Sequence, residues 1–134
     1  MMTNSQLQEA ILKTALTHVA FEGWTMNALE AGATEAGLPA EDAARAFPRG
    51  PVEAVVLHSA LADTHMTALM AALDPPPART AQKVAMAIRL RLEAAAPERE
   101  AVRLGLGLLA RPQYAPLGLK ALGRTVDAVW RSAG

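Results

Sequence analysis

The stretch TMNALEAGATEAGLPAEDAARAFPRGP, residues 25–51, decides the fold of this chain. Thr25 is placed to cap a helix, because a threonine side chain can accept a hydrogen bond from the free backbone N–H groups at a helix start. Gly37 ends that helix, and a short helix is expected over residues 40–47, before a proline. A helix, a tight glycine turn and a second short helix follow the order of a helix-turn-helix unit.

Further helices are predicted on both sides of this stretch. Before it, apolar residues recur at helical spacing after Ser5, with Gln8 in position to complete a capping box. After it, prolines and apolar periodicity predict helices over residues 51–73, 80–96 and 98–110 and a last one after Pro116. We therefore expect an all-α protein, with a three-helix unit in residues 1–50 and about four further helices in residues 51–134.

The composition agrees with a helical chain and excludes several kinds of site. The 134 residues include no cysteine, so disulfide scaffolds, cysteine-based zinc sites and thiol nucleophiles are excluded. Hydrophobic residues make up 51% of the chain, and aromatic residues only 4%. No apolar run reaches the length of about 18 residues that a membrane-spanning helix needs, and the N-terminus lacks the pattern of a signal peptide. The expected location is the cytoplasm.

The charge is balanced overall but unevenly distributed. Residues 1–74 carry a formal net charge of −6, and residues 75–134 carry +6. The two halves can present oppositely charged, solvated faces that suit each other. The basic half can instead approach anionic lipid headgroups, which predicts peripheral contact with a membrane. Its basic residues can equally form pairs within a helix, as Asp127 and Arg131 can at i,i+4.

No catalytic or metal site can be assembled from the sequence. His58 and His65 are seven residues apart on one predicted helix, a separation of about 10 Å that one metal ion cannot bridge. Gly105 and Gly107 match a dinucleotide-binding fingerprint, but no strand precedes them, as that motif requires. We expect these glycines to allow close helix packing or to leave room for a ligand. The sequence predicts no enzyme, no cofactor and no metal.

Asp63 is the unusual acidic residue, because it falls within the apolar face of the helix predicted over residues 51–73. A buried carboxylate needs a partner, and such residues occur at functional sites. The plainer alternatives are that this part of the helix faces solvent, or that Asp63 meets an arginine of the next helix.

The last predicted helix has two distinct sides. The apolar side holds Leu119, Leu122, Val126, Val129 and Trp130, and the polar side holds Lys120, Arg124, Asp127 and Arg131. We expect this apolar side to need a partner from outside the chain, which supports a homodimer.

Several blocks resemble known families. The residues Trp24–Leu29, Glu35–Leu38 and Ala46–Pro51 resemble the TetR-type transcription regulators. The whole sequence is more similar to an offshoot of that fold, the accessory lipid-binding family of ubiquinone (coenzyme Q) biosynthesis, called COQ-nine in eukaryotes. The blocks that carry this resemblance are Phe21–Thr25, Phe47–Pro51, Ile88–Leu92, Leu109–Pro116 and Thr125–Gly134.

The resemblance implies a TetR-like helical fold that binds lipid in an apolar pocket. It also implies that a partner, the diiron hydroxylase of ubiquinone synthesis, receives quinone intermediates from the protein. By matching position, Asp127 and Val129 fall in the family's patch for the hydroxylase, and Trp130 lies in the same block, although its place on the apolar side suggests a core residue. The family's further C-terminal helices and membrane-binding helix have no counterpart in these residues.

The candidate ligands are an isoprenoid lipid or a quinone intermediate, with a phospholipid as another possibility. Helices predicted after residue 50 are rich in leucine, methionine and alanine, so they can line an apolar pocket or build an ordinary close-packed core. The candidate pocket residues are Met66, Leu69, Met70, Ile88, Leu92, Leu108, Leu122 and Val126.

The alternative function is a TetR-type regulator that binds DNA through its helix-turn-helix. The predicted recognition helix, residues 40–47, holds two acidic residues and one basic residue, and the surrounding half of the chain is acidic. Phosphate contacts supply most of the affinity for DNA, so this surface would repel its ligand. The sequence therefore favours a lipid-binding accessory protein without a nucleic-acid partner, placed in the cytoplasm or peripherally at the inner (cytoplasmic) membrane of a bacterium.

Overall fold

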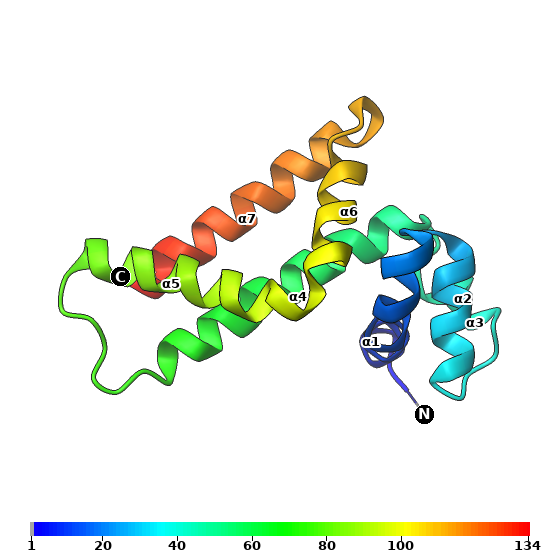
Figure 1. The fold of residues 1–134 in the computed structure, drawn as a ribbon, viewed down its shortest axis with the longest axis horizontal. Helices are drawn as coiled ribbons and strands as arrows, with labels where there is room; N and C mark the ends of the chain where they lie inside the picture. Colours follow the sequence, from blue (N-terminus) through cyan, green and yellow to red (C-terminus); the bar gives the residue numbers. More distant parts are fainter. Residues whose placement is uncertain (1) are drawn as a thin grey trace.

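The computed structural model describes residues 2–134, and these residues form helices and turns without any strand. The predicted all-α fold is confirmed, and its order of a three-helix unit followed by four further helices is consistent with a TetR-like arrangement (Figure 1). The helices are α1 (Asn4–Glu22), α2 (Met26–Glu35), α3 (Asp42–Ala46), α4 (Pro51–Ala71), α5 (Thr80–Ala95), α6 (Arg99–Leu109) and α7 (Ala115–Ala133), with short 3₁₀ turns at Ala96–Glu98 and Pro112–Tyr114.

The helix boundaries follow local sequence signals. The Thr25 side chain accepts a hydrogen bond from the backbone of Ala28 at 3.1 Å, as predicted for the cap of α2. Gly37 adopts a φ of 82°, a conformation that favours glycine, directly after α2. The predicted cap of α1 is wrong: Thr3 and not Ser5 begins the capping box, together with Gln6. Gln8 is used elsewhere, and its side chain donates to the Ala46 carbonyl at 2.9 Å.

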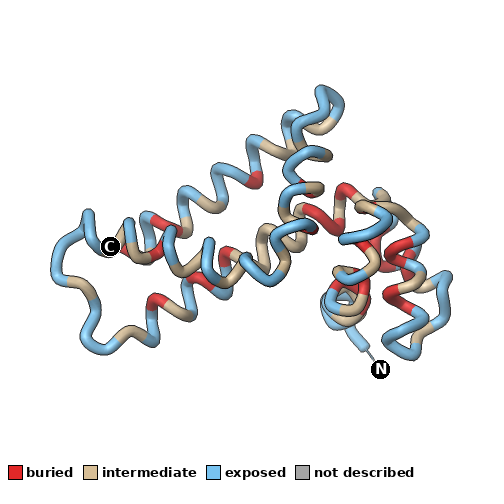
Figure 2. Tube along the Cα trace, in the orientation of Figure 1, coloured by how far each residue is buried: buried red, intermediate tan, exposed pale blue. Residues whose placement is uncertain are grey.

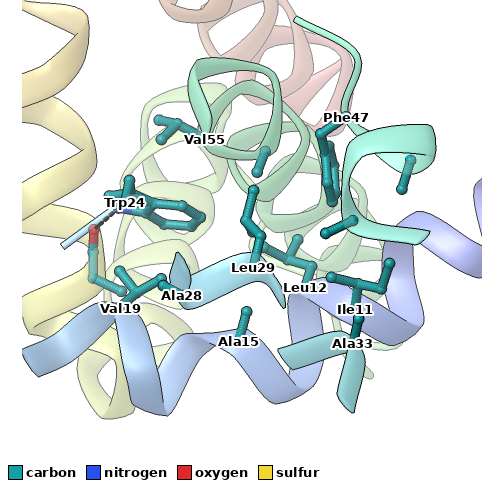
Figure 3. Close-up of a cluster of buried hydrophobic side chains, with 14 residues drawn as sticks. Ile11, Leu12, Ala15, Val19, Trp24, Ala28, Leu29, Ala33, Phe47 and Val55 are labelled. Carbon is teal, nitrogen blue, oxygen red and sulfur yellow. Dashed lines mark hydrogen bonds between the residues drawn. The ribbon is translucent and has the colours of Figure 1, made fainter. Parts of the chain in front are cut away.

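The first three helices form a tight unit. Gly32 of α2 lies so close to α1 that a Cβ atom there would be 2.6 Å from the Cβ of Ala15. The Thr14 hydroxyl donates to the Gly32 carbonyl at the same crossing. Figure 3 shows the surrounding core, in which Leu29 and Phe47 are almost completely buried.

The long helix α4 belongs to two clusters of buried side chains. Ala54 and Val55, near its start, pack with the three-helix unit. Met66 and Met70, near its end, pack with Ala87 of α5 and Val129 of α7. Because one helix serves both clusters, the packing does not test the predicted domain boundary at residue 50, which stays a prediction.

The helices α5 and α7 pack along α4 and along each other, and the C-terminus lies beside the start of α5 (Figure 1). Buried residues gather in α1–α3 and along α4, whereas much of α5, α6 and α7 is exposed (Figure 2).

Trp24 connects the three-helix unit to α6. Its indole Nε1 donates to the Ala101 carbonyl at 2.9 Å, a link between residues 77 positions apart. Gly105, one turn further along α6, lies against the same indole: a Cβ there would be 3.1 Å from Val55 and 3.4 Å from Trp24. The predicted use of a glycine for close helix packing is confirmed at Gly105, whereas Gly107 has no such neighbour. The Trp24 contact thereby joins the start of α6 to the three-helix unit.

Candidate functional site

A cavity of about 440 Å³ lies where α1, α4, α5 and α6 meet. Its size falls in the range of about 300–1,000 Å³ that is usual for small-molecule sites. It is open to solvent on one side and lined mainly by apolar side chains.

The helix α4 supplies one long wall of the cavity. Val55, His58, Ser59, Ala62 and His65 line it, and their spacing brings them to one face of the helix. The opposite walls come from α1 and from the region where α5 passes into α6. Their apolar lining residues are Leu12 and Leu16 of α1, Leu92, Ala94 and Ala95 of α5, and Ala101, Val102, Leu106 and Leu109 of α6.

A polar pair lies in the wall between α4 and α6. His58 Nε2 is 2.6 Å from Glu98 Oε1, and the imidazole is 15% exposed. The same imidazole lies against the buried Trp24 ring, with 5.6 Å between the ring centroids. The cavity therefore has a fixed hydrogen-bonding group beside its apolar walls, the combination that orients a ligand with one polar end.

A buried ion pair closes the wall beside Ser59. Arg91 of α5 donates through Nε to Asp63 Oδ1 at 2.9 Å, and its Nη2 lies 3.3 Å from the Ser59 hydroxyl. The Thr125 hydroxyl of α7 donates to the same Asp63 oxygen at 2.8 Å. Asp63 is only 4% exposed. The alternative in which Asp63 meets an arginine of the next helix is therefore confirmed, and the alternative of a solvent-facing Asp63 is wrong.

The predicted pocket residues do not come together in this cavity. Leu92 lines it. Met66 and Met70 instead lie in the close-packed cluster between α4, α5 and α7. Three others are exposed on the outer sides of their helices, and two are half-buried: the exposed residues are Ile88, Leu122 and Val126, and the half-buried residues are Leu69 and Leu108.

Sequence reasoning missed the contribution of α1 to the cavity. Leu12 and Leu16 belong to an apolar face that was predicted, but periodicity identifies a buried face without naming what covers it. Ala94 and Val102 carried no signal, because small apolar residues at a helix junction resemble any other core residues.

The three predicted partner residues have different environments. Asp127 is exposed and forms an ion pair with Arg131 at 3.0 Å, as its i,i+4 spacing allows. Trp130 is 59% exposed, so the suggestion that it is a core residue is wrong. Val129 is the core residue instead, since it is 8% exposed and packs in the α4–α5–α7 cluster. A buried Val129 offers no surface to a partner.

Four of the five residues on the predicted apolar side of α7 are left uncovered within residues 2–134, whereas Val129 is covered. The exposed members are Leu119, Leu122, Val126 and Trp130, spaced three or four residues apart, and we call these four residues the α7 stripe. Exposed apolar patches of this kind mark sites of interaction.

Two features of the described residues bear on the kind of site. Among the described residues, no group of three or more histidine, aspartate or glutamate side chains is placed to hold a metal ion. No helix between residues 2 and 134 is both long enough and apolar enough to cross a membrane.

Fold and site together define an all-helical, TetR-like protein with an apolar cavity between its helices. Comparison with known proteins found no matching family model. The chain is similar to ubiquinone biosynthesis proteins of the COQ9 family. It is 31% identical over 141 residues to the mitochondrial COQ9-B of Xenopus laevis, covering 98% of this chain and 47% of that relative. It is 30% identical to COQ9-A of the same frog and to COQ9 of Xenopus tropicalis, each over 98% of this chain and 44% of the relative.

This similarity extends along the whole chain and supports the resemblance to the COQ9 family. The chain spans about half the length of the curated relatives it matches. One prediction is contradicted: a place in the cytoplasm or at the inner membrane of a bacterium is wrong by this comparison, because all three relatives are named as mitochondrial proteins.

The buried pair predicts unequal effects for two aspartates. Asp63→Ala leaves the Arg91 guanidinium without its carboxylate in a mostly buried position. We expect the free energy of unfolding to fall by about 3–5 kcal/mol. Asp127→Ala removes an exposed pair and should change it by no more than about 0.5 kcal/mol. Urea unfolding followed by circular dichroism measures both, and equal effects of the two variants would show that the Asp63 pair does not hold these helices.

Proposed function

We propose that this protein is a noncatalytic accessory protein of ubiquinone biosynthesis that holds an isoprenoid lipid or a quinone intermediate. The observation that carries the proposal is the apolar cavity between α1, α4, α5 and α6. The similarity to COQ9 proteins over 98% of the chain supports the pathway.

The cavity chemistry suits an amphiphile with a small polar end. Leucine, valine and alanine side chains from four elements form its walls and can remove an apolar chain from water, at a gain of about 25 cal/mol for each Å² buried. His58 lies in the wall of the cavity, with its Nε2 engaged by Glu98. A quinone or phenol head group has oxygens that suit such a group. A phospholipid tail fits the same walls, so its head group is what distinguishes it from the other candidates.

The α7 stripe supports a protein partner, for which we propose the diiron hydroxylase that would receive the ligand. Trp130 supplies a large exposed aromatic surface and Asp127 a charge on the adjoining side of the helix. Tryptophan is enriched among the residues that dominate binding energy at interfaces. We also propose that a second copy can cover this stripe when the hydroxylase is absent, which gives a homodimer.

Contact with a membrane surface is a further part of the proposal. Arg99, Lys120 and Arg124 are exposed and form no ion pair within residues 2–134. Each basic residue near an anionic surface contributes about 1 kcal/mol of attraction.

The regulator alternative has one structural argument for it and one against it. The α2–α3 order matches a helix-turn-helix, which favours it. However, α3 has only five residues, and its single basic residue, Arg45, lies 3.7 Å from Asp42 of the same helix. An arginine that is engaged with a carboxylate is less available to a phosphate or a base edge. We therefore propose no nucleic-acid partner.

Filling the cavity tests the lipid proposal. Ala94 lines the cavity, and Ala85, on the same helix, is exposed and lies outside it. We expect lipid recovered from purified Ala94→Phe to fall at least fivefold, because the new ring occupies the ligand's space. Ala85→Phe should retain the wild-type amount. The measurement is mass spectrometry of organic extracts from protein made in a ubiquinone-producing host.

The identity of the extracted compound gives the second part of that test. Enrichment of quinone or prenylated precursor over an unrelated helical protein supports the proposed pathway. An extract no richer than that of the unrelated protein would contradict the lipid proposal.

A tryptophan substitution tests the partner proposal. Trp130→Ala removes an exposed side chain, so the fold should be retained while the affinity for the diiron hydroxylase falls about tenfold or more. Phe21→Ala is the matched control, because Phe21 is an equally apolar aromatic residue, 92% exposed at the end of α1. Biolayer interferometry with the purified hydroxylase measures both, and an unchanged affinity of Trp130→Ala would rule out the stripe as the contact.

A further inference from the structure

The mouth of the cavity between α1, α4, α5 and α6 has a polar edge and an apolar edge. The residues that line the cavity and are also exposed mark this mouth: Glu9 and Lys13 of α1 and His65 of α4 on the polar edge, and Leu92 of α5 and Leu106 of α6 on the apolar edge. Both leucines are 64% exposed. An apolar chain that leaves the cavity over these leucines stays in contact with apolar surface, which keeps part of it out of water.

The apolar edge continues outside the cavity along α5. Ile88 precedes Leu92 by four residues, so the two side chains lie on one face of the helix. Ile88 is 46% exposed and does not line the cavity. Val84, a further turn back, is half-buried and packs against the cluster around Met66 and Met70. The line from Leu92 to Val84 extends the apolar edge by about 12 Å, at the rise of an α-helix.

The neighbouring helix α4 borders this line with uncharged residues. The two helices pack against each other and are joined by residues 72–79 (Figure 1). Leu69 of α4 is half-buried and follows the cavity-lining His65 by four residues, so it lies on the same face of α4. Residues 64–73 include no aspartate, glutamate, lysine or arginine. We call the surface formed by Leu69, Ile88 and Leu92 the α4–α5 seam.

The charged side chains of α5 beside the seam are engaged with each other or with α4. Arg91 donates to the buried Asp63 at 2.9 Å, and Arg89 donates to Glu93 at 2.8 Å. Each positive charge therefore has a negative charge beside it. The seam consequently offers apolar contact without a free charge of α5 that would select a charged ligand.

The size of the cavity bears on what the seam can receive. Its volume of about 440 Å³ lies in the lower half of the range of about 300–1,000 Å³ that is usual for small-molecule sites. A lipid with a long chain must therefore leave part of that chain outside the cavity. Burial gains about 25 cal/mol for each Å² of apolar surface, so the chain is better placed over Leu92 than over Glu9 and Lys13.

We propose that the α4–α5 seam receives the outer part of a long isoprenoid chain whose other end lies in the cavity. This inference rests on the proposed lipid function and deepens it, because it assigns the ligand to the long-chain lipids and gives the path of the chain. A protein partner fits the seam less well. A standard protein interface uses about 20–30 residues on each side, whereas a single chain needs only a line of apolar side chains.

Cysteine footprinting of the full chain tests this proposal, because the native sequence contains no cysteine. Ile88→Cys places a thiol in the seam, Ala94→Cys places one in the cavity, and Leu119→Cys is the matched control at an exposed apolar position of α7. The probes are geraniol, which has a short chain, and geranylgeraniol, which has a longer one. The measurement is the rate of alkylation by iodoacetamide, followed by mass spectrometry, with and without each alcohol.

We expect both alcohols to slow the alkylation of Ala94→Cys, because each can enter the cavity. Only geranylgeraniol should slow the alkylation of Ile88→Cys, by at least fivefold, because only its chain extends past the mouth. Leu119→Cys should react at the same rate under all three conditions.

The other outcomes separate this proposal from the lipid function on which it rests. If geranylgeraniol protects Ala94→Cys but not Ile88→Cys, the seam is wrong and the lipid-binding cavity stands. If neither variant is protected, the proposed lipid function is contradicted as well. Equal protection of Leu119→Cys would show adsorption to any apolar surface and would overturn the seam. Slow alkylation of Ile88→Cys without lipid that is relieved by dilution would assign the seam to a second copy of the chain instead.

Discussion

The hydrogen-bonded ion pair between Asp63 and Arg91 is the interaction on which the second half of the structure depends. Asp63 belongs to α4, Arg91 to α5, and Thr125, which donates to the same carboxylate oxygen, to α7. These three helices, which also share an apolar cluster around Met66, Met70 and Val129, are thereby joined at one polar point. A buried charge pair is specific, because each group is stable in the interior only when its partner is in place. The pair therefore fixes the register of the three helices as well as their contact.

Two hollows among the described residues adjoin that ion pair. Arg91 lines the cavity between α1, α4, α5 and α6, and Asp63 lines a groove between α4 and α7. At the other end of the cavity, Trp24 holds α6 against the three-helix unit through the Ala101 carbonyl. Small residues, among them Ala94, Ala95 and Ala101, line the cavity where α5 passes into α6.

The sequence predicted the helices well because their ends are marked locally. Thr25, Gly37 and Pro51 each act on the backbone next to them, so their effects can be recognised without knowledge of the fold. Asp63 was singled out by its apolar neighbours, and an arginine of the next helix was among its expected partners. Which arginine pairs with Asp63 depends on how α4 and α5 cross, and no local sequence pattern specifies that crossing.

The sites were predicted less completely, for a physical reason. A helical wheel gives the apolar side of a helix but not how far a neighbouring helix covers it. On α7 the expected core residue was Trp130. In the structure Val129 lies under α5 instead, while Trp130 extends into solvent. The cavity depends on four elements distant in the sequence, and its α1 wall shows only as an ordinary amphipathic face. Interhelical spaces are properties of packing, which periodicity does not specify.

Hydrogen–deuterium exchange, compared between the Arg91→Met and Arg89→Met variants, tests the role of the ion pair most directly. Arg89, two residues earlier on α5, forms an exposed pair with Glu93 and serves as the control. If the Asp63–Arg91 pair organises the second half of the molecule, Arg91→Met will lose protection in α5, α7 and the later turns of α4, while α1–α3 stay protected. Arg89→Met will exchange as the wild type does. Retained protection of α5 and α7 in Arg91→Met, or equal loss throughout the chain, would contradict the account.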